Sequence, residues 1–557
     1  MQSNRYIKRL MIICLAVCFL LSLWACNTDK PSDGTENSSN DVVDESGEET
    51  VTDKEEDNSS EMPYADEALF ETTPYQSGVA ITNYLGDGGV IRIPEVIYGS
   101  TVLAINANSF KDIKKSETEK ERVISEIIVP SSVQIIEHGA FSGCKKIEAL
   151  TVPFAGGAAD AHTYIGYVFG AVNPQGNTKA LPESLVSLTV GGLTVHDSAF
   201  YGCESIKSVV LTEAESVGKS AFENCYALRT LLMPDTVTAI GDNAMGGCTS
   251  ITTLSLPYLG NGEDKLFLGA SFGASDYTQN LDCVPSSLRT LTVSVPNELP
   301  EGAFYECKNL VTLNLKGNLK TVNEKTFYRC RRLKYLNVEY EGYTGISSIA
   351  PYSFAYCAAL TEIRLDEGVN EIPEGAFYSC SALRTVSIGD KVNELPASHS
   401  DIGDFAFTYC ESLPSFVLPR GITEIKEKMF YGCSSLVAID IPASVSVIGK
   451  DAFMGCSTLK TVTVQTSGAE GVTTIGEGAF SYCLSLKALE LPKCVTDIGD
   501  RAFAFSGIKE LAVKGENVSV GKNVFDGCEG FLVDVSSGSD TYSNFVEAGL
   551  GNSNFKN

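Results

Sequence analysis

The sequence predicts an α/β fold that is mostly β: a solenoid in which each coil contributes one strand to a parallel sheet. A unit of about 23 residues recurs along the chain, with Cys410, Cys433 and Cys456 at equal steps of 23 residues. Within a unit, apolar residues such as Ile439 and Ile441 alternate with other residues, which indicates a strand with two inward side chains. The 557 residues are also too many for one ordinary core, which favours a repetitive stack.

Each part of the unit has a structural reason. Proline follows the strand in several units, where no backbone donor is needed; these prolines are Pro153, Pro234, Pro257, Pro419 and Pro442. A Val-x-x-Ile-Gly segment then turns the chain back, and an Ala-Phe pair fills the far side of the coil. A single coil buries too little apolar surface to be stable alone, so the coils must stack. A period of about 20 to 29 residues is typical of leucine-rich-repeat coils.

The full pattern Cys-x-x-Leu-x-x-Ile-x-Leu-Pro-x-x-Val-x-x-Ile-Gly-x-x-Ala-Phe-x-x-Cys resembles the BspA-type leucine-rich repeat of bacterial surface proteins, over residues 79–535. The resemblance implies a right-handed solenoid of about 15 to 17 coils with parallel strands on its concave face. It also implies a cell-surface location, with adhesion or binding of a host protein as the usual role. The sequence departs from the pattern at Met245, which replaces a phenylalanine, at Ser506, which replaces a cysteine, and in a charged insertion over 111–121.

Two units are longer than the others. They contain the matching segments 165–171 and 268–274, and they belong to a duplicated block of about 104 residues. We expect each enlarged coil to bulge from the solenoid, as a recognition element or as an ornamental loop. At the other end, Tyr542, Phe545 and Val546 have helical spacing, which predicts a cap over 536–557 that closes the solenoid of residues 69–535.

The N-terminal residues have the features of a lipoprotein signal. Arg5, Lys8 and Arg9 precede an apolar run over 10–25, too short for a spanning helix of ~20 residues. The ending Leu-Trp-Ala-Cys resembles a bacterial lipobox, which implies a signal peptide over 1–25 and lipidation of Cys26. Residues 27–61 include thirteen acidic residues and only two lysines. This composition predicts a disordered acidic tether over 26–68.

Thirteen cysteines occupy the same position of the unit, from Cys144 to Cys528. Packing, disulfides and metal binding are all compatible with the bare repetition. Stacked residues keep their Cβ atoms farther apart than a disulfide prefers, and zinc ligands come in closer pairs. We therefore favour packing, with each thiol filling a small pocket beside a phenylalanine and donating weakly to a turn carbonyl.

No residue pattern indicates catalysis. The four histidines, His138, His162, His196 and His399, form no close pair. Gly269 to Gly273 matches the G-x-S-x-G pattern, but Ser271 aligns with Val168 in the duplicate and the strand-to-helix context is missing. The sequence therefore predicts no enzyme, no cofactor and no metal. The formal charge of -28 also disfavours nucleic acid as a partner.

Two surfaces are candidates for ligand binding. Most outward strand positions carry Ser or Thr, which suit an exposed sheet, but the middle of the array carries larger and more varied residues. This candidate ligand face consists of Tyr335, Asn337, Glu362 and Arg364. The second candidate is a tyrosine stripe, because a tyrosine follows the buried phenylalanine in several coils and interfaces favour tyrosine; its main members are Tyr305, Tyr328, Tyr378 and Tyr431.

These observations lead to one functional hypothesis and one alternative. The hypothesis is a lipid-anchored protein on the extracellular face of a bacterial envelope, whose solenoid binds an extracellular protein or glycan in adhesion. It touches the membrane only through its lipid anchor. The alternative is a structural spacer with no specific ligand.

Overall fold

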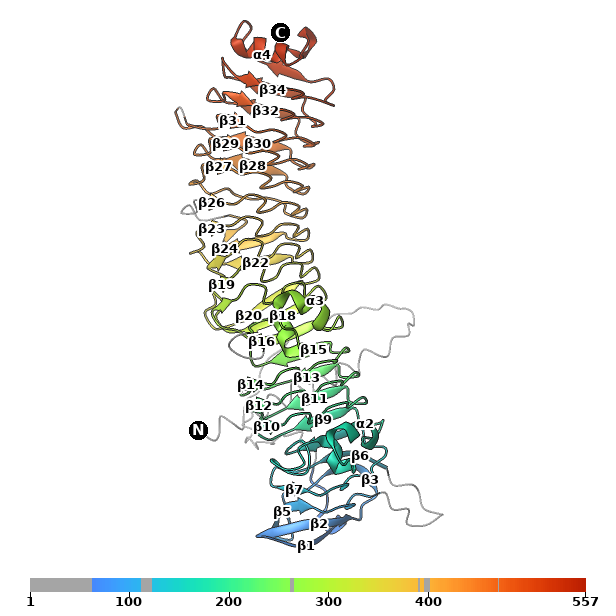
Figure 1. The fold of residues 1–557 in the computed structure, drawn as a ribbon. Coiled ribbons are helices and arrows are strands. Elements are labelled where there is room, and N and C mark those ends of the chain that lie inside the picture. Colours follow the sequence, from blue (N-terminus) through green and yellow to red (C-terminus); the bar gives the residue numbers. More distant parts are fainter. Residues whose placement is uncertain are drawn as a thin grey trace, which may run out of the picture.

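The computed structural model describes residues 63–111, 123–260, 265–388, 391–394, 401–468 and 470–556. The chain forms an elongated stack of about 19 turns, with strands β1 and β2 at one end and helix α4 at the other (Figure 1). The mostly β, parallel solenoid expected from the repeat is confirmed. It has about 19 turns, against the 15 to 17 expected. Strands β3 (Gly88–Arg92) and β6 (Val123–Ile128) form turns before the first ladder cysteine, Cys144.

An antiparallel hairpin covers the N-terminal end of the stack. It consists of β1 (Phe70–Tyr75) and β2 (Gly78–Tyr84), and β2 then pairs in parallel with β5 (Ser100–Ile105), which also pairs with β4 (Val96–Ile97). The segment before β1 also contacts the stack: η1 (Glu67–Leu69) precedes β1, and the Ala65 amide donates to the Arg92 carbonyl at 2.9 Å. The folded part therefore starts a few residues before the expected boundary at 69.

A parallel sheet of ten strands forms one face of the N-terminal half. The strands follow one another in chain order and in register, so that Leu254, Leu291, Leu313 and Leu336 form one inward row. After β3 and β6, the strands are β8 (Ala149–Val152), β9 (Ser187–Val190), β11 (Ser208–Leu211), β13 (Thr230–Leu232), β15 (Thr253–Leu256), β16 (Thr290–Ser294), β18 (Thr312–Lys316) and β20 (Tyr335–Glu339).

The C-terminal half continues the same face in shorter sheets. Its strands are β22 (Glu362–Leu365), β24 (Thr385–Ile388), β25 (Lys391–Val392), β28 (Ala438–Ile441), β30 (Thr461–Val464), β32 (Ala488–Leu491), β34 (Glu510–Val513) and β36 (Leu532–Asp534). The β22 and β24 strands pair in parallel, as do β28 with β30 and β32 with β34 and β36.

The Val-x-x-Ile-Gly segments form a second column of two-residue strands. These are β7 (Ile135–Ile136), β10 (Thr194–Val195), β12 (Ser216–Val217), β14 (Ala239–Ile240), β17 (Glu298–Leu299), β19 (Thr321–Val322), β21 (Ser348–Ile349), β23 (Glu371–Ile372), β26 (Asp401–Ile402), β27 (Glu424–Ile425), β29 (Val447–Ile448), β31 (Thr474–Ile475), β33 (Asp497–Ile498) and β35 (Ser519–Val520). The second residue of nearly every pair is buried, so the column contributes one side chain per coil to the core.

Phenylalanines stack along the core in a continuous row. Neighbouring ring centroids lie 5.0 to 5.8 Å apart with nearly parallel planes. This Phe row consists of Phe304, Phe327, Phe354, Phe377, Phe407, Phe430, Phe453, Phe480, Phe503 and Phe525. Met245, which replaces a phenylalanine in its unit, is equally buried.

The ladder cysteines bond to the buried phenylalanine of the preceding coil. In eleven of the thirteen, Sγ lies 3.0 to 3.3 Å from the carbonyl oxygen of the preceding phenylalanine and donates to it. All cysteines in the described ranges are free thiols. The packing interpretation, with a weak donor to a turn carbonyl, is confirmed. Cys203 and Cys307 lack this bond because each follows an enlarged coil.

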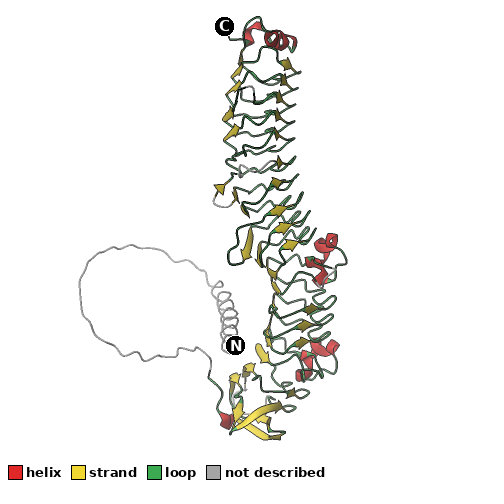
Figure 2. Ribbon diagram, turned by 90° about the vertical axis from the view of Figure 1, so that its left-hand side faces the viewer, coloured by secondary structure: helices red, strands yellow, loops and turns green. Residues whose placement is uncertain are grey.

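The enlarged coils contain short helices that stand on one side of the stack (Figure 2). The first contains η2 (Ile165–Phe169), η3 (Pro174–Gly176) and α2 (Asn177–Ala180), and the second contains η4 (Leu268–Phe272), η5 (Tyr277–Gln279) and α3 (Asn280–Cys283). A buried asparagine holds each coil in place. Asn177 accepts from the Gly166 amide at 2.9 Å, and Asn280 accepts from the Gly269 amide at 2.8 Å. The strands on either side of each enlarged coil still pair in register.

Helix α4 (Asp540–Glu547) covers the C-terminal end of the core. Ser539 caps it by accepting the Tyr542 amide at 3.2 Å, and the buried Phe545 ring lies 6.2 Å from Phe525. The chain then passes through η6 (Asn552–Asn554), and Phe555 forms a bridge with Val533 of the last strand. This bridge partly covers the edge of β36. An uncovered strand edge would leave unpaired backbone groups that could pair with another chain.

Candidate ligand-binding site

The sheet is interrupted between β20 and β22, in the middle of the stack. The ladder cysteines on either side, Cys330 and Cys357, are 27 residues apart instead of 23. The extra residues form a loop over 340–346, whose last residue, Ile346, bridges to Leu365 at the end of β22. Among the described residues, no backbone hydrogen bond joins β20 to β22. We call this interruption the ladder break.

The ladder break opens a hollow of about 180 Å³ over the core. Leu336 and Val338 are inward residues of β20, yet they are only half-buried, whereas the equivalent Leu313 and Leu315 of β18 are fully buried. The hollow is lined by Leu336, Val338, Tyr343, Ile346, Glu362, Ile363, Arg364 and Ser387. An apolar floor with a few polar groups at its rim is the usual composition of a binding site.

The structure brings two residues of the candidate ligand face to this hollow and places the other two beside it. Glu362 and Arg364 are exposed at its rim, and Arg364 Nε donates to the Thr344 carbonyl of the loop at 3.2 Å. Tyr335 and Asn337 lie on the outer surface of β20 and do not line the hollow. Tyr335 is 47% exposed, and the Lys334 ammonium lies 4.9 Å from its ring centroid.

The loop beside the hollow is held by charged side chains. Lys320 Nζ donates to Thr344 Oγ1 at 2.8 Å and lies 3.7 Å from Asp366. Hydrogen bonds from Thr344 and from the Gly368 amide lower the pKa of Asp366, so this carboxylate stays charged. Burial raises the pKa of Tyr343 to about 12. The rim of the hollow is therefore a fixed surface with its polar groups already in place.

The tyrosine stripe forms one continuous row of contacting rings. Successive centroids are 5.1 to 6.3 Å apart, and the row contains Tyr277, Tyr305, Tyr328, Tyr356, Tyr378, Tyr409 and Tyr431. Most of these rings are half-buried and shield the turns behind them. A hydrogen bond with Tyr409, together with burial, raises the pKa of Tyr431 to about 12. The stripe is a continuous aromatic edge without a hollow, so it is the weaker of the two candidates.

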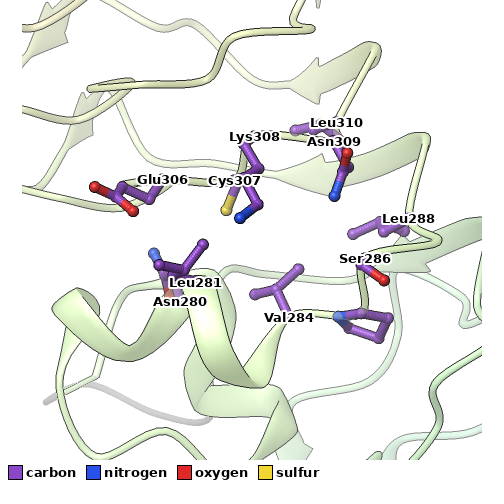
Figure 3. A pocket seen from close by; sticks show the side chains of 11 residues that line it. Asn280, Leu281, Val284, Ser286, Leu288, Glu306, Cys307, Lys308, Asn309 and Leu310 are labelled. Carbon is purple, nitrogen blue, oxygen red and sulfur yellow. The ribbon is translucent and has the colours of Figure 1, made fainter.

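The enlarged coils border two other depressions. Beside α3 lies a hollow of about 100 Å³, and the Cys307 side chain points from the next coil toward this helix (Figure 3). A shallow trough of about 780 Å³ extends over β10, β12 and β14, between Thr163 and Tyr258 of the two enlarged coils. The first is small, and the second is wide and open. Neither exposes core side chains as the ladder break does.

The residues with a formal resemblance to catalytic groups have structural partners. Ser271 is fully buried and donates to the Gly260 carbonyl at 3.0 Å. His138 and His196 lie 3.2 and 2.8 Å from the carbonyls of Ala171 and Ala159, and His162 stacks on Tyr167. His399 lies outside the described residues, as do Cys26 and most of the charged insertion. In the part of the chain that the structure describes, no three His, Cys, Asp or Glu side chains converge on a metal site.

Sequence reasoning missed the floor of the hollow. Leu336 and Val338 look like ordinary core residues, and Tyr343 and Ile346 fall between repeats. The available signal was the spacing of the ladder cysteines, because a coil with four extra residues cannot keep every strand in register with its neighbours. The same signal marks the longer coils that end at Cys410 and Cys483, where the sheet is also interrupted.

The repeat model described as the BspA type leucine rich repeat region matches six times, over residues 111–156, 186–276, 285–399 and 400–531. These segments make up more than half of the chain. The chain belongs to the BspA-type leucine-rich-repeat family. The matches leave out 157–185 and 277–284, which contain α2 and α3, so these two helices lie outside the matched repeats. Membership of this family suggests a role in protein interaction at a surface.

Several solved structures are similar to the chain at low identity. A leucine-rich repeat protein from Bacteroides ovatus is 21% identical, with 87% of this chain and 97% of that protein covered and a TM-score of 0.34. A leucine rich cell surface protein from Faecalibacterium prausnitzii is 18% identical, with 88% and 99% covered and a TM-score of 0.26. The pneumococcal vaccine antigen PcpA is 16% identical, with 87% and 94% covered and a TM-score of 0.22.

No curated protein matches the sequence. Within the described ranges, no helix combines the length and the apolar composition needed to span a bilayer.

Proposed function

We propose that this BspA-type protein binds an extracellular protein or glycan at the ladder break, and that it acts by binding rather than by catalysis. The observation that carries the proposal is the loss of burial at Leu336 and Val338, at the ladder break where the ten-stranded sheet ends. A ligand that covers the apolar surface exposed at the ladder break gains free energy by removing that surface from water. Tyr335 and Arg364, beside and at the rim of the hollow, are of the types that dominate binding energy at interfaces.

Binding by the purified chain to protein and glycan arrays tests this proposal. Once a ligand is found, replacing both Tyr335 and Arg364 by Ala should weaken its binding at least tenfold, because such residues typically contribute more than about 1 kcal/mol each. The matched control replaces Thr461 and Thr463 by Ala, since they are the exposed outward residues of β30. Affinity unchanged by the first pair would discard the ladder break as the site. An absence of any ligand on either array would favour the structural spacer.

We also propose that Cys26 carries a lipid that anchors the protein to the outer surface of the cell envelope. The support is the charged and apolar leader followed by Leu-Trp-Ala-Cys, together with the acidic segment that separates it from the solenoid. Changing Cys26 to Ser should abolish incorporation of a labelled fatty acid in cells. Changing Cys18 to Ser, within the apolar run, should leave the label in place. Label retained by the Cys26 variant would refute the anchor.

A further inference from the structure

Lysine and arginine residues line up along one edge of the sheet face, in a protein with a formal charge of -28. Each of these residues directly precedes a strand: β11, β13, β16, β20, β24, β30, β32 and β34. We call this set the basic column; it consists of Lys207, Arg229, Arg289, Lys334, Arg384, Lys460, Lys487 and Lys509. The equivalent position before β8 carries Glu148, the one acidic residue between β8 and β36 at this position in the described chain.

Backbone hydrogen bonds show that these residues stand above one another. The Arg229 amide donates to the Lys207 carbonyl at 2.8 Å, the Lys334 amide donates to Val311, and the Lys509 amide donates to Lys487. Adjacent coils are ~4.8 Å apart where strands pair, so the twelve steps from Lys207 to Lys509 extend over about 60 Å. The column is therefore a long array of positive charge along one edge of the sheet face.

The charges of the basic column have no acidic partner in the structure. Seven of the eight side chains are exposed, and none forms a salt bridge with another residue of the described ranges. Three of them donate to neutral backbone carbonyls, namely Arg289, Lys487 and Lys509. On the outward positions of the strands from β8 to β20, Glu339 is the one acidic residue among the described residues. Further along the face, acidic residues lie on the strands themselves, at Glu362, Asp440, Glu490 and Glu510. Like charges held in a row without counter-charges favour an anionic ligand.

A row of hydroxyl groups lies next to the basic column. The first outward residues of successive strands form one register row that ends at Tyr335; the row contains Ser187, Ser208, Thr230, Thr253, Thr290 and Thr312. Hydroxyls of this kind can both donate to and accept from sugar hydroxyls. The exposed ring of Tyr335 offers an apolar face on which a sugar ring can stack.

We propose that the ligand on this face is a linear anionic polysaccharide, held by the basic column and by the adjacent hydroxyl row. From Arg229 to Arg384 the cations recur at every second coil, or about 10 Å. Two linked sugars extend over a comparable length, so a polysaccharide with one acidic group per disaccharide matches the column. Nucleic-acid phosphates follow one another at ~3.4 Å along a strand and match it poorly. This inference rests on the proposed binding role and specifies its ligand class.

The test measures binding of the full chain to hyaluronan, which carries one carboxylate per disaccharide, to alginate, which carries two, and to neutral dextran and polyglutamate, at several salt concentrations. The variant changes Lys207, Arg229, Lys334 and Arg384 to Gln. It should bind both anionic polysaccharides at least tenfold more weakly, and the slope of log affinity against log salt should fall by up to about four. The control makes the same change in charge away from the column, at Lys219, Arg420, Lys450 and Lys522, and should bind as the unchanged chain does.

Four results would overturn the proposal: no binding to either anionic polysaccharide, equal binding to neutral dextran, equal loss in both variants, or binding to polyglutamate as strong as to the polysaccharides. Strong binding to polyglutamate would indicate that the ligand of the basic column is an acidic protein. The result of this test can be distinguished from the result of the test of the ladder break. A ligand that is lost with Tyr335 and Arg364 but retained by the basic-column variant would preserve the proposed function and end this inference.

Discussion

Replacing Phe430 by Ala will lower the free energy of unfolding by about 3 to 5 kcal/mol, the usual cost of truncating a buried phenylalanine. Its side chain is fully buried, with ring centroids 5.6 Å from Phe407 and 5.5 Å from Phe453. The substitution leaves a cavity between two coils, where stacking supplies the stability that one coil lacks. Urea unfolding followed by circular dichroism measures the loss.

The control is Phe505→Ala, at a ring that is 42% exposed and stacks on Tyr482 at 5.0 Å. We expect it to cost less than about 1 kcal/mol, because surface substitutions usually have small effects. Equal losses for the two variants would mean that the Phe row does not hold the coils together. Hydrogen exchange should also accelerate around Phe430 first, since each coil contacts only its neighbours.

Alkaline pH will destabilise the fold steeply above about pH 9. Burial raises the pKa of the eight ladder thiols from Cys307 to Cys483, to about 12 for Cys380. Below the unfolded thiol pKa of about 8.5, these groups are protonated in both states and their contribution is fully present. Above it, the unfolded chain releases protons that the folded chain retains. Each thiol then lowers the free energy of unfolding by about 1.4 kcal/mol per pH unit.

A triple variant separates the effect of the thiols from that of the other groups that titrate at alkaline pH. Cys433, Cys456 and Cys483 can be changed to Ser, the residue that the chain itself uses at Ser506. Between pH 9 and 10, the slope of unfolding free energy against pH should be shallower by about 4 kcal/mol per pH unit in the variant. Stability at pH 7 gives the baseline for each protein. Identical slopes would show that the ladder thiols ionise freely in the folded state, against the buried geometry.

The regular part of the fold was predictable because its signals are local and repeated. The alternation around Ile439 and Ile441 and the Ala-Phe pairs indicate the strand and the buried ring in every coil. Stacking requires these positions to lie above one another, so the sequence period determines the register. The interpretation of the cysteines as packing groups follows from the Cβ spacing of stacked residues, which is too long for a disulfide, and from sequence separations too long for zinc ligands. Their bonds to phenylalanine carbonyls confirm it.

The irregular features depend on contacts between coils, which no single unit reveals. Asn177 and Asn280 look like ordinary loop residues, yet each pins an enlarged coil through a buried amide. The ladder break depends on Ile346 pairing with Leu365, a contact that exists only because four extra residues displace the strand. Tyr335, Asn337, Glu362 and Arg364 were chosen for their size and variety. Two of them do lie at the hollow, but their chemistry alone did not reveal it.

Hydrogen exchange of the chain with and without a bound ligand tests the central claim most directly. In the free protein, the amides of β22 that face β20 should exchange faster than those of β30, because they have no strand to pair with. On adding a ligand from the arrays, we expect new protection over 335–346 and 361–365. Protection confined to other coils, with these two segments unchanged, would contradict the assignment of the ladder break as the recognition site.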